Sequence, residues 1–296
     1  MKDPKRGEDD LPRGALLMVT SALLFAAMGE AVKMASAHLS NTMVVFFRNA
    51  LGLVALAPWL LTLGAKGLRT TAWREHFVRG LAGLASMYCY FYAIAELGLS
   101  EAILLNYSLP LFMPLIARAW LGEQVPARLW RALGLGFLGI LLILRPGVGV
   151  FRPAALAALG AAVLAALAQV GVRRLTRTEP IARIVFYFAL ISTVVSAVPV
   201  LPNWTTPEGG LWIVLVAMGV LATVAQLVMT QAYAHAPAAQ VGPFIYSSVV
   251  FAGLMDWWLW GRLPDLAFVA GALLVCAAGM LALRSTAASP VPPPSG

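Results

Sequence analysis

Three charged side chains lie inside the first two long apolar stretches of this sequence. Glu30 and Lys33 stand three residues apart in 14–36, so a helix would carry them on one face. Arg48 lies in 41–63, the next apolar stretch. Glu30 and Arg48 are about equally far from the short link between these stretches, roughly 9 to 10 Å at a rise of about 1.5 Å per residue. We therefore expect either a structural Glu30–Arg48 ion pair or a site where one of the two meets substrate charge, with Glu30 as a candidate proton site.

Uncharged polar groups and helix breakers recur in further apolar stretches. The phenols of Tyr88 and Tyr92 share one face of 73–95, which suits the wall of a cavity for an aromatic or amphipathic ligand. Prolines remove backbone donors, so Pro110 and Pro114 are candidate kinks or hinges. Ordinary packing and hydrogen bonding between helices are the competing interpretation throughout. The remaining candidates are, for the cavity, Asn106, Tyr107, Gln226, Gln231, Tyr246 and Ser247, and, for a second hinge, Gly242 and Pro243.

Long apolar stretches account for most of the 296 residues. A hydrocarbon core about 30 Å thick is crossed by about 20 helical residues. Composition agrees with membrane residence, because 60% of the residues are hydrophobic and 11% are charged. The sequence thus predicts an all-α integral membrane protein with ten transmembrane helices. These are expected at 14–36, 41–63, 73–95, 101–121, 127–145, 153–173, 181–201, 211–233, 239–260 and 264–284.

The positive charges between these stretches alternate by side. If the N-terminus is cytoplasmic, the inner side holds most of the lysines and arginines, including Arg79 and Arg173. The outer side then holds Arg145, Arg152 and Arg262. This is the distribution of the positive-inside rule, and it predicts that both termini are cytoplasmic. It also accounts for the net charge of +8 without a nucleic-acid partner.

The two halves of the chain resemble each other. Aligning 93–144 with 232–283 pairs Tyr107-Ser108 with Tyr246-Ser247, and Gly122 with Gly261. Because each half holds an odd number of stretches, the second half must enter the membrane from the opposite side. This predicts two inverted five-helix repeats, an arrangement suited to alternating access around a central site. We expect the repeats at 14–145 and 153–284, a cytoplasmic segment at 1–13 and a disordered cytoplasmic tail at 285–296.

The stretch 93–144 also resembles the end of the repeat in EamA-type members of the drug/metabolite transporter superfamily. The resemblance rests on the Gly122-Glu123 turn, on the Gly-rich helix after it and on the Phe46-Phe47-Arg48 run. The second half departs from it at Gly261-Arg262, where the first half has Gly-Glu. The resemblance implies ten helices in two inverted repeats, export of small metabolites or drugs, and no cofactor.

Motifs for catalysis and metal binding are not found in the sequence. There is no Gly-rich phosphate loop, no HExxH and no Cys/His cluster with metal-ligand spacing. The histidines, His38, His76 and His235, fall near predicted loops and form no credible catalytic set. We expect no catalytic residue, no metal and no cofactor, so the chain is not interpreted as an enzyme.

We interpret the chain as a multi-pass secondary transporter of the bacterial inner membrane. It is expected to export a small organic metabolite, such as an amino acid or a similar amphipathic compound. The expected partners are the lipid bilayer, the small-molecule substrate and, if Glu30 titrates, protons, but not nucleic acid, and the protein is expected to be a monomer or a weak homodimer. The alternatives are a multidrug or cationic-compound exporter, a channel, a membrane enzyme and a structural membrane protein. The cavity is expected to be lined by 14–36, 73–95, 101–121, 153–173, 211–233 and 239–260.

Overall fold

The computed structural model describes residues 9–97, 99–145, 154–261 and 263–286. Within these ranges every regular element is a helix, as the sequence predicts. Most of the predicted N-terminal segment and tail, together with Arg152 and Arg262, lies outside the described residues. The α-helices are α1 (Leu11–Ser36), α2 (Asn41–Ala55), α3 (Ala57–Gly67), α4 (Trp73–Leu97), α5 (Leu99–Asn106), α6 (Leu109–Leu121), α7 (Ala127–Leu144), α8 (Ala155–Leu175), α9 (Ile181–Ala197), α10 (Leu211–His235), α11 (Ala238–Val241), α12 (Ser247–Trp260) and α13 (Leu266–Thr286). The 3₁₀-helices are η2 (Leu201–Asn203) and η3 (Gly242–Tyr246).

The exterior of this bundle is apolar. By length and composition, 8 helical segments of the described chain could cross a membrane, and α2 and α9 are shorter apolar helices. Large apolar side chains point outward, among them Leu156, Ile213 and Leu273, which are 73%, 75% and 66% exposed. Such a surface suits lipid and not water. The crossing of all ten predicted spans stays a prediction, as does the side on which each end lies.

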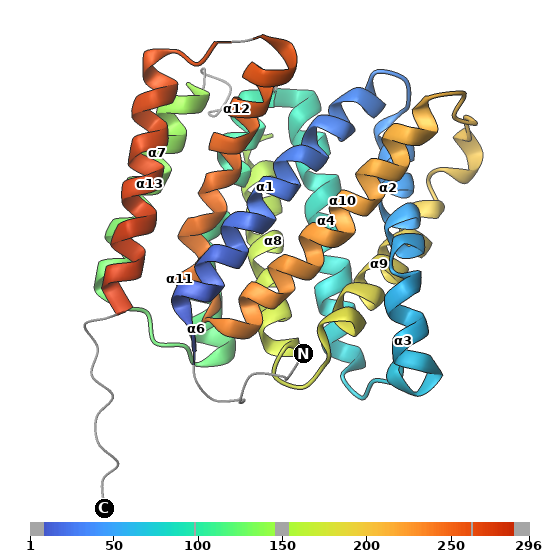
Figure 1. The fold of residues 1–296 in the computed structure, drawn as a ribbon, viewed down its shortest axis with the longest axis horizontal. Helices are drawn as coiled ribbons and strands as arrows, with labels where there is room; N and C mark the ends of the chain where they lie inside the picture. Colours follow the sequence, from blue (N-terminus) through green and yellow to red (C-terminus); the bar gives the residue numbers. More distant parts are fainter. Residues whose placement is uncertain (1–8, 98, 146–153, 262, 287–296) are drawn as a thin grey trace, which may run out of the picture.

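Three helix pairs hold the bundle together. α1 packs along α10, α4 packs along α8, and α7 packs along α13. Figure 1 shows α7 and α13 at one edge of the molecule and α2, α3 and α9 at the other, with the remaining pairs between them. The α7–α13 crossing depends on two glycines, because a Cβ on Gly139 would lie 2.6 Å from the carbonyl oxygen of Gly271. Small residues at such crossings allow the close backbone approach typical of membrane helices.

Two of the apolar segments are broken in their N-terminal half. α5 ends at Asn106 and α6 begins at Leu109, since Pro110 has no N–H to continue the ladder. In the second half, Gly242 and Pro243 open the 3₁₀-helix η3 between α11 and α12. α6 and α12 then end alike, because Gly122 and Gly261 adopt left-handed conformations with φ of 68° and 66°.

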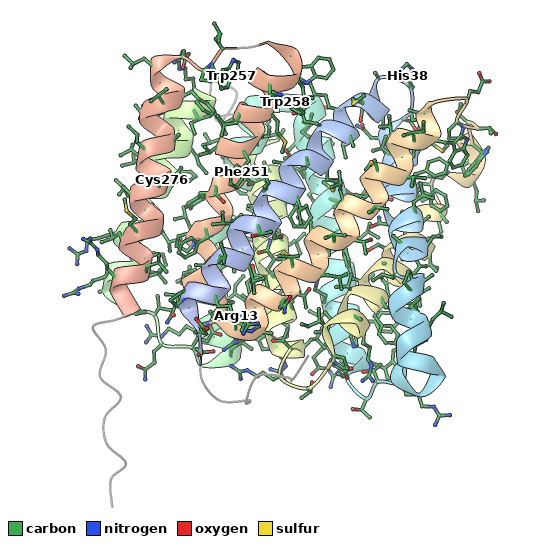
Figure 2. The ribbon with its side chains drawn as sticks, in the orientation of Figure 1. Arg13, His38, Phe251, Trp257, Trp258 and Cys276 are labelled. Atoms are coloured by element: carbon green, nitrogen blue, oxygen red, sulfur yellow. The ribbon has the colours of Figure 1, made fainter. Side chains whose placement is uncertain are left out.

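The two ends of the bundle differ in character. α1 begins and α13 ends at the same end (Figure 1). Figure 2 places Arg13 at that end and Trp257 and Trp258 at the opposite end, where Trp258 is 82% exposed. Exposed tryptophans at one level are typical of a membrane interface.

The ends of α7 and α13 are joined at the tryptophan-bearing end of the bundle. Arg145 Nη2 donates to Asp265 Oδ2 at 2.6 Å. Asp265 also accepts a hydrogen bond from the backbone N–H of Phe268 in the first turn of α13, and this bond, together with Arg145, lowers the pKa of its carboxyl group. The charged form of Asp265 is therefore favoured where it caps the helix.

Candidate functional site

A cavity of about 290 Å³ lies in the centre of the bundle. All six segments expected to line it contribute residues, and α2 and α9 add Arg48 and Phe188. A second hollow, of about 490 Å³, is formed by the end of α1 and by exposed loop residues such as Thr205 and Thr206. We place the site in the central cavity, because residues from both halves of the chain meet there, as in transporters built from repeats.

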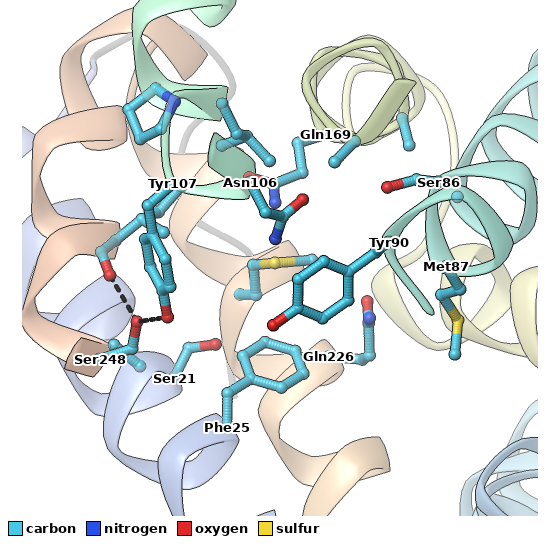
Figure 3. A pocket seen from close by; sticks show the side chains of 18 of the residues that line it. Ser21, Phe25, Ser86, Met87, Tyr90, Asn106, Tyr107, Gln169, Gln226 and Ser248 are labelled. Carbon is cyan, nitrogen blue, oxygen red and sulfur yellow. Dashed lines mark hydrogen bonds between the residues drawn. The ribbon is translucent and has the colours of Figure 1, made fainter. Parts of the chain in front are cut away.

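The central cavity is lined by aromatic rings and by a few polar groups. Figure 3 shows the Tyr90 phenol pointing towards the middle, with the Phe25 ring below it and the side chains of Asn106 and Gln226 nearby. The Tyr107 hydroxyl reaches in from the other side and is hydrogen-bonded to Ser248 Oγ (Figure 3). This mixture suits a ligand with an apolar body and a few polar groups.

Several of the polar groups in the wall are already satisfied by the protein. Ser21 Oγ on α1 donates to the carbonyl oxygen of Ala225 on α10 at 2.9 Å. Ser86 Oγ on α4 donates to the carbonyl oxygen of Ala161 on α8 at 2.7 Å. These bonds tie together the two central helix pairs at matching places. In contrast, the Oδ1 atom of Asn106 is buried without a hydrogen-bond partner, which leaves an acceptor for a ligand.

Two arginines supply the charge of the cavity. Arg79, on α4, is 4% exposed, and its Nη2 donates to Gln226 Oε1 at 3.0 Å. Arg48, on α2, donates from Nη1 to Asn49 Oδ1 at 3.1 Å, and its Nε lies 3.3 Å from the sulfur of Met28. Among the described residues that line the cavity there is no acidic side chain. The cavity therefore carries net positive charge.

Five of the residues and hinge positions proposed from the sequence reach this lining. They are Arg48, Asn106, Tyr107, Gln226 and Pro110. The second hinge lies directly behind the first, because a Cβ on Gly242 would lie 3.7 Å from Pro110 Cβ. Pro114 and Pro243 are buried in the packing around them. The two broken segments thus meet beside the cavity.

The other predicted site residues lie outside the lining. Tyr92 is 56% exposed on the surface of α4, and Tyr88 and Gln231 are half-buried away from the cavity. Tyr246 is fully buried, with its ring so close to α7 that a Cβ on Gly136 would lie 2.5 Å from Tyr246 Cδ2. Its partner in the alignment, Tyr107, does line the cavity. Ser247 Oγ, at the start of α12, donates to the carbonyl oxygen of Phe244 in the preceding 3₁₀-helix η3.

Glu30 has partners other than the expected Arg48. Its Oε2 accepts a hydrogen bond from Trp260 Nε1 at 2.8 Å and lies 3.8 Å from Lys33 Nζ. Lys33 in turn forms an ion pair with Asp256 at 2.7 Å. A Glu30–Arg48 pair is not among the ion pairs of the described residues. These contacts link α1 to α12 at the tryptophan-bearing end of the bundle.

Sequence reasoning missed several residues of the lining. Arg79 was expected among the charges of an inner loop, but it is buried in the bundle. His235, which was expected near a loop, is also buried, at the end of α10. Tyr90 was passed over in favour of Tyr88 and Tyr92. A signal was present, because Arg79, Gly83, Ser86 and Tyr90 are spaced by four, three and four residues along α4, which places them on one helical face. Other residues that were missed are Phe25, Gln169, Phe188 and Ser248.

Comparison with known proteins covers nearly the whole chain. The model of the EamA-like transporter family matches residues 12–145 and 152–284. The pseudopaline exporter CntI of Pseudomonas aeruginosa is 34% identical over 273 residues, which are 91% of this chain and 95% of that protein. A riboflavin transporter of Vibrio cholerae is 31% identical over 89% of this chain and 90% of its own length. An S-adenosylmethionine uptake transporter of Rickettsia felis is 24% identical over 82% of each chain. A solved crystal structure, 21% identical, has a TM-score of 0.83 and covers 95% of this chain and 100% of the other, so the fold is shared.

Proposed function

Since the chain belongs to the EamA-like transporter family of the drug/metabolite transporter superfamily, we propose that it is a secondary transporter that exports a small organic metabolite. The expected substrate is an amino acid or a similar amphipathic compound. The observation that carries the proposal is the central cavity, which combines aromatic rings with polar groups from both halves of the chain. Export follows the pseudopaline exporter, whereas the riboflavin and S-adenosylmethionine relatives are named as transporters and uptake transporters.

Alternating access between two inverted five-helix repeats is the proposed mechanism. The helix pairing supports it. α1 of the first half packs along α10 of the second half, and α4 of the first half packs in the same way along α8 of the second, as a pseudo-twofold axis requires. The family match in two consecutive segments supports it as well. The broken segments at Pro110 and Gly242 lie side by side at the cavity, where bending of either could admit or release a ligand. The bacterial inner membrane is the proposed location.

The alternative of a multidrug or cationic-compound exporter is disfavoured by the charge of the cavity. Arg48 and Arg79 would repel a cation that entered it, and the described lining offers no carboxylate to attract one. A cationic substrate would also have to leave both guanidinium groups without a counter-ion, at the expense of binding free energy.

Counterflow into proteoliposomes tests the proposal. Vesicles are preloaded with unlabelled amino acids, nucleosides or cationic dyes, and uptake of the labelled compound is followed with and without a pH gradient. We expect saturable exchange of amino-acid-like compounds and none of the dyes. Exchange of dyes alone would favour the multidrug alternative, and conduction without counterflow would favour a channel. No exchange of any compound by folded protein would contradict the transport proposal.

Two variants connect the result to the structure. Asn106→Leu fills part of the cavity with an apolar side chain and is expected to weaken exchange, whereas Cys276→Ser changes an exposed position on α13 and is the matched control. Glu30→Gln tests proton coupling, because coupling through Glu30 requires that this variant lose its response to the pH gradient. If Glu30→Gln transports less but responds to the pH gradient as the wild type does, that result would count against a role of Glu30 in proton coupling.

A further inference from the structure

The arginines of the cavity are unusual within this protein. Four other arginines of the described chain, Arg145, Arg173, Arg174 and Arg183, have a carboxylate oxygen within 4.0 Å of a side-chain nitrogen, and the remaining described arginines are exposed. Neither Arg48 nor Arg79 is part of an ion pair among the described residues, although both face the central cavity. Charged groups away from water are normally paired, because an unpaired buried charge lowers stability. Among the described residues, these two arginines therefore have no carboxylate partner.

The surroundings of Arg79 leave part of its guanidinium group available. One face of the group lies over the Phe188 ring, with Cζ 3.9 Å from the ring centroid. Gln226 occupies one donor of Nη2 at 3.0 Å. The Nε atom is buried and has no hydrogen-bond partner. Gly83 leaves room for the group, since a Cβ there would lie 2.9 Å from Arg79 Nη1. The protein thus holds the group in place, while its Nε donor is unused among the described residues.

We propose that the cavity binds an amphipathic organic anion, with its carboxylate on Arg79. This inference rests on the proposed transport function and specifies the substrate class. Two donors on the edge of a planar guanidinium group match the two oxygens of a carboxylate. Arg48 adds a second positive charge to the same cavity, which attracts anions and repels cations.

The rest of the cavity accommodates the remainder of such a molecule. Phe25, Met87 and Tyr90 form an apolar and aromatic wall close to the arginine-bearing helices. The unpartnered Oδ1 atom of Asn106 can accept a hydrogen bond from an amide or amino N–H of the ligand. A volume of about 290 Å³ is at the small end of the range of ligand cavities, about 300 to 1,000 Å³. These features favour a compact aromatic carboxylate over a large or strongly hydrated anion.

The test compares acids with their primary amides, which have nearly the same shape but no charge. The probes are N-acetyl-L-phenylalanine, 3-phenylpropanoate and indole-3-acetate, each paired with its amide. Binding to the purified full chain in detergent is measured by titration calorimetry, and counterflow of the same compounds is measured in proteoliposomes. We expect at least one acid to bind about tenfold or more tightly than its amide, as hydrogen bonds to charged groups imply.

Variants assign this preference to Arg79. Arg79→Gln should remove the preference for the acid, whereas Arg79→Lys, which keeps the charge but not the planar group, should retain it with weaker binding. Arg128→Gln removes an exposed arginine at the start of α7 and should leave the preference unchanged. If Arg79→Gln does not fold, as judged by gel filtration, the inference is tested by the acid–amide comparison in the wild type and in Arg48→Gln.

The outcomes separate this inference from the proposed function. Equal binding of acids and amides, an intact preference in Arg79→Gln, or no binding of any acid would overturn the inference, even if other compounds are exchanged. A preference for acids that depends on Arg79, without counterflow of any compound, would support the inference and contradict the transport proposal.

Discussion

Arg173 joins several segments at the end of the bundle where α1 begins. Its Nη2 lies 2.7 Å from Asp9 Oδ1, and its Nη1 donates to the carbonyl oxygen of Tyr233 at 2.8 Å. Its Nε lies 3.5 Å from Glu123 Oε1. One side chain on α8 thus contacts the segment just before α1, the end of α10 and the turn between α6 and α7. We expect this network to be the strongest polar contribution to closing this end of the bundle.

The burial of the two central groups sets the size of the expected effect. The side chains of Arg173 and Glu123 are 11% and 7% exposed. Arg173→Gln leaves Glu123 as a buried carboxylate without its counter-ion, and removal of one partner of such a pair costs about 3 to 5 kcal/mol of the free energy of unfolding. Glu123→Gln should cost less, because Arg173 keeps its bond to Asp9, which is 50% exposed and hydrated.

A double-mutant cycle measures this difference. The free energies of unfolding of the wild type, Arg173→Gln, Glu123→Gln and the double variant are determined by equilibrium titration with SDS in mixed micelles. We expect the double variant to be more stable than the sum of the single effects predicts, with a coupling energy of about 1 to 3 kcal/mol. Effects that add within about 0.5 kcal/mol would refute the reasoning, since groups that do not interact behave in that way.

Two further substitutions test the packing of the bundle and the contacts at its other end, by the same unfolding measurement. Gly139→Ala places a methyl group 2.6 Å from the backbone oxygen of Gly271, which cannot move without its helix, so we expect a loss of about 1 to 3 kcal/mol. Gly134→Ala, where a Cβ meets nothing within 4 Å, is the control, and equal effects would contradict the close crossing. Trp260→Phe removes the indole N–H that donates to the α1 carboxylate at 2.8 Å, and should cost about 1.5 to 3 kcal/mol. Trp258→Phe, at an 82% exposed position, should cost little, and the reverse order would show that the hydrogen bond is unimportant.

Much of the fold follows from local rules. Apolar stretches of membrane length predict the helices, and Pro110 and Gly242-Pro243 predict the places where two segments break. Gly122 and Gly261 were paired by the alignment of the two halves, and both end a helix in the left-handed conformation. These features depend on a few neighbouring residues, and for that reason they are visible in the sequence.

The site is less predictable, because it depends on which face of each helix turns inward. Tyr107 and Tyr246 occupy equivalent positions in the alignment, but Tyr107 faces the cavity, whereas Tyr246 is buried against Gly136 of α7. Hydropathy does not distinguish the two positions, since both lie in apolar stretches of the sequence. Arg79 was missed for a related reason. A cation near the predicted start of a span is assigned to the loop, because the sequence does not show that α8 and α10 cover it.

The two ends of α1 differ in the strength of the contacts that hold them. At one end, Lys33 and Asp256 form a pair whose side chains are 45% and 34% exposed, and such exposed pairs contribute about 0 to 1 kcal/mol. The Trp260–Glu30 hydrogen bond is a second contact at this end, expected to contribute about 1.5 to 3 kcal/mol. At the other end, Arg173 and Glu123 form a buried pair, and breaking it is expected to cost about 3 to 5 kcal/mol. In a protein that alternates between two openings, the empty cavity should therefore open more readily at the Lys33 end. In the orientation that the positive-inside rule predicts, that is the outer end. An exporter must load its substrate from the inner side, which requires the Arg173 network to open. Part of the free energy of substrate binding then has to offset the cost of that opening. This would couple the inward-facing state to the presence of substrate.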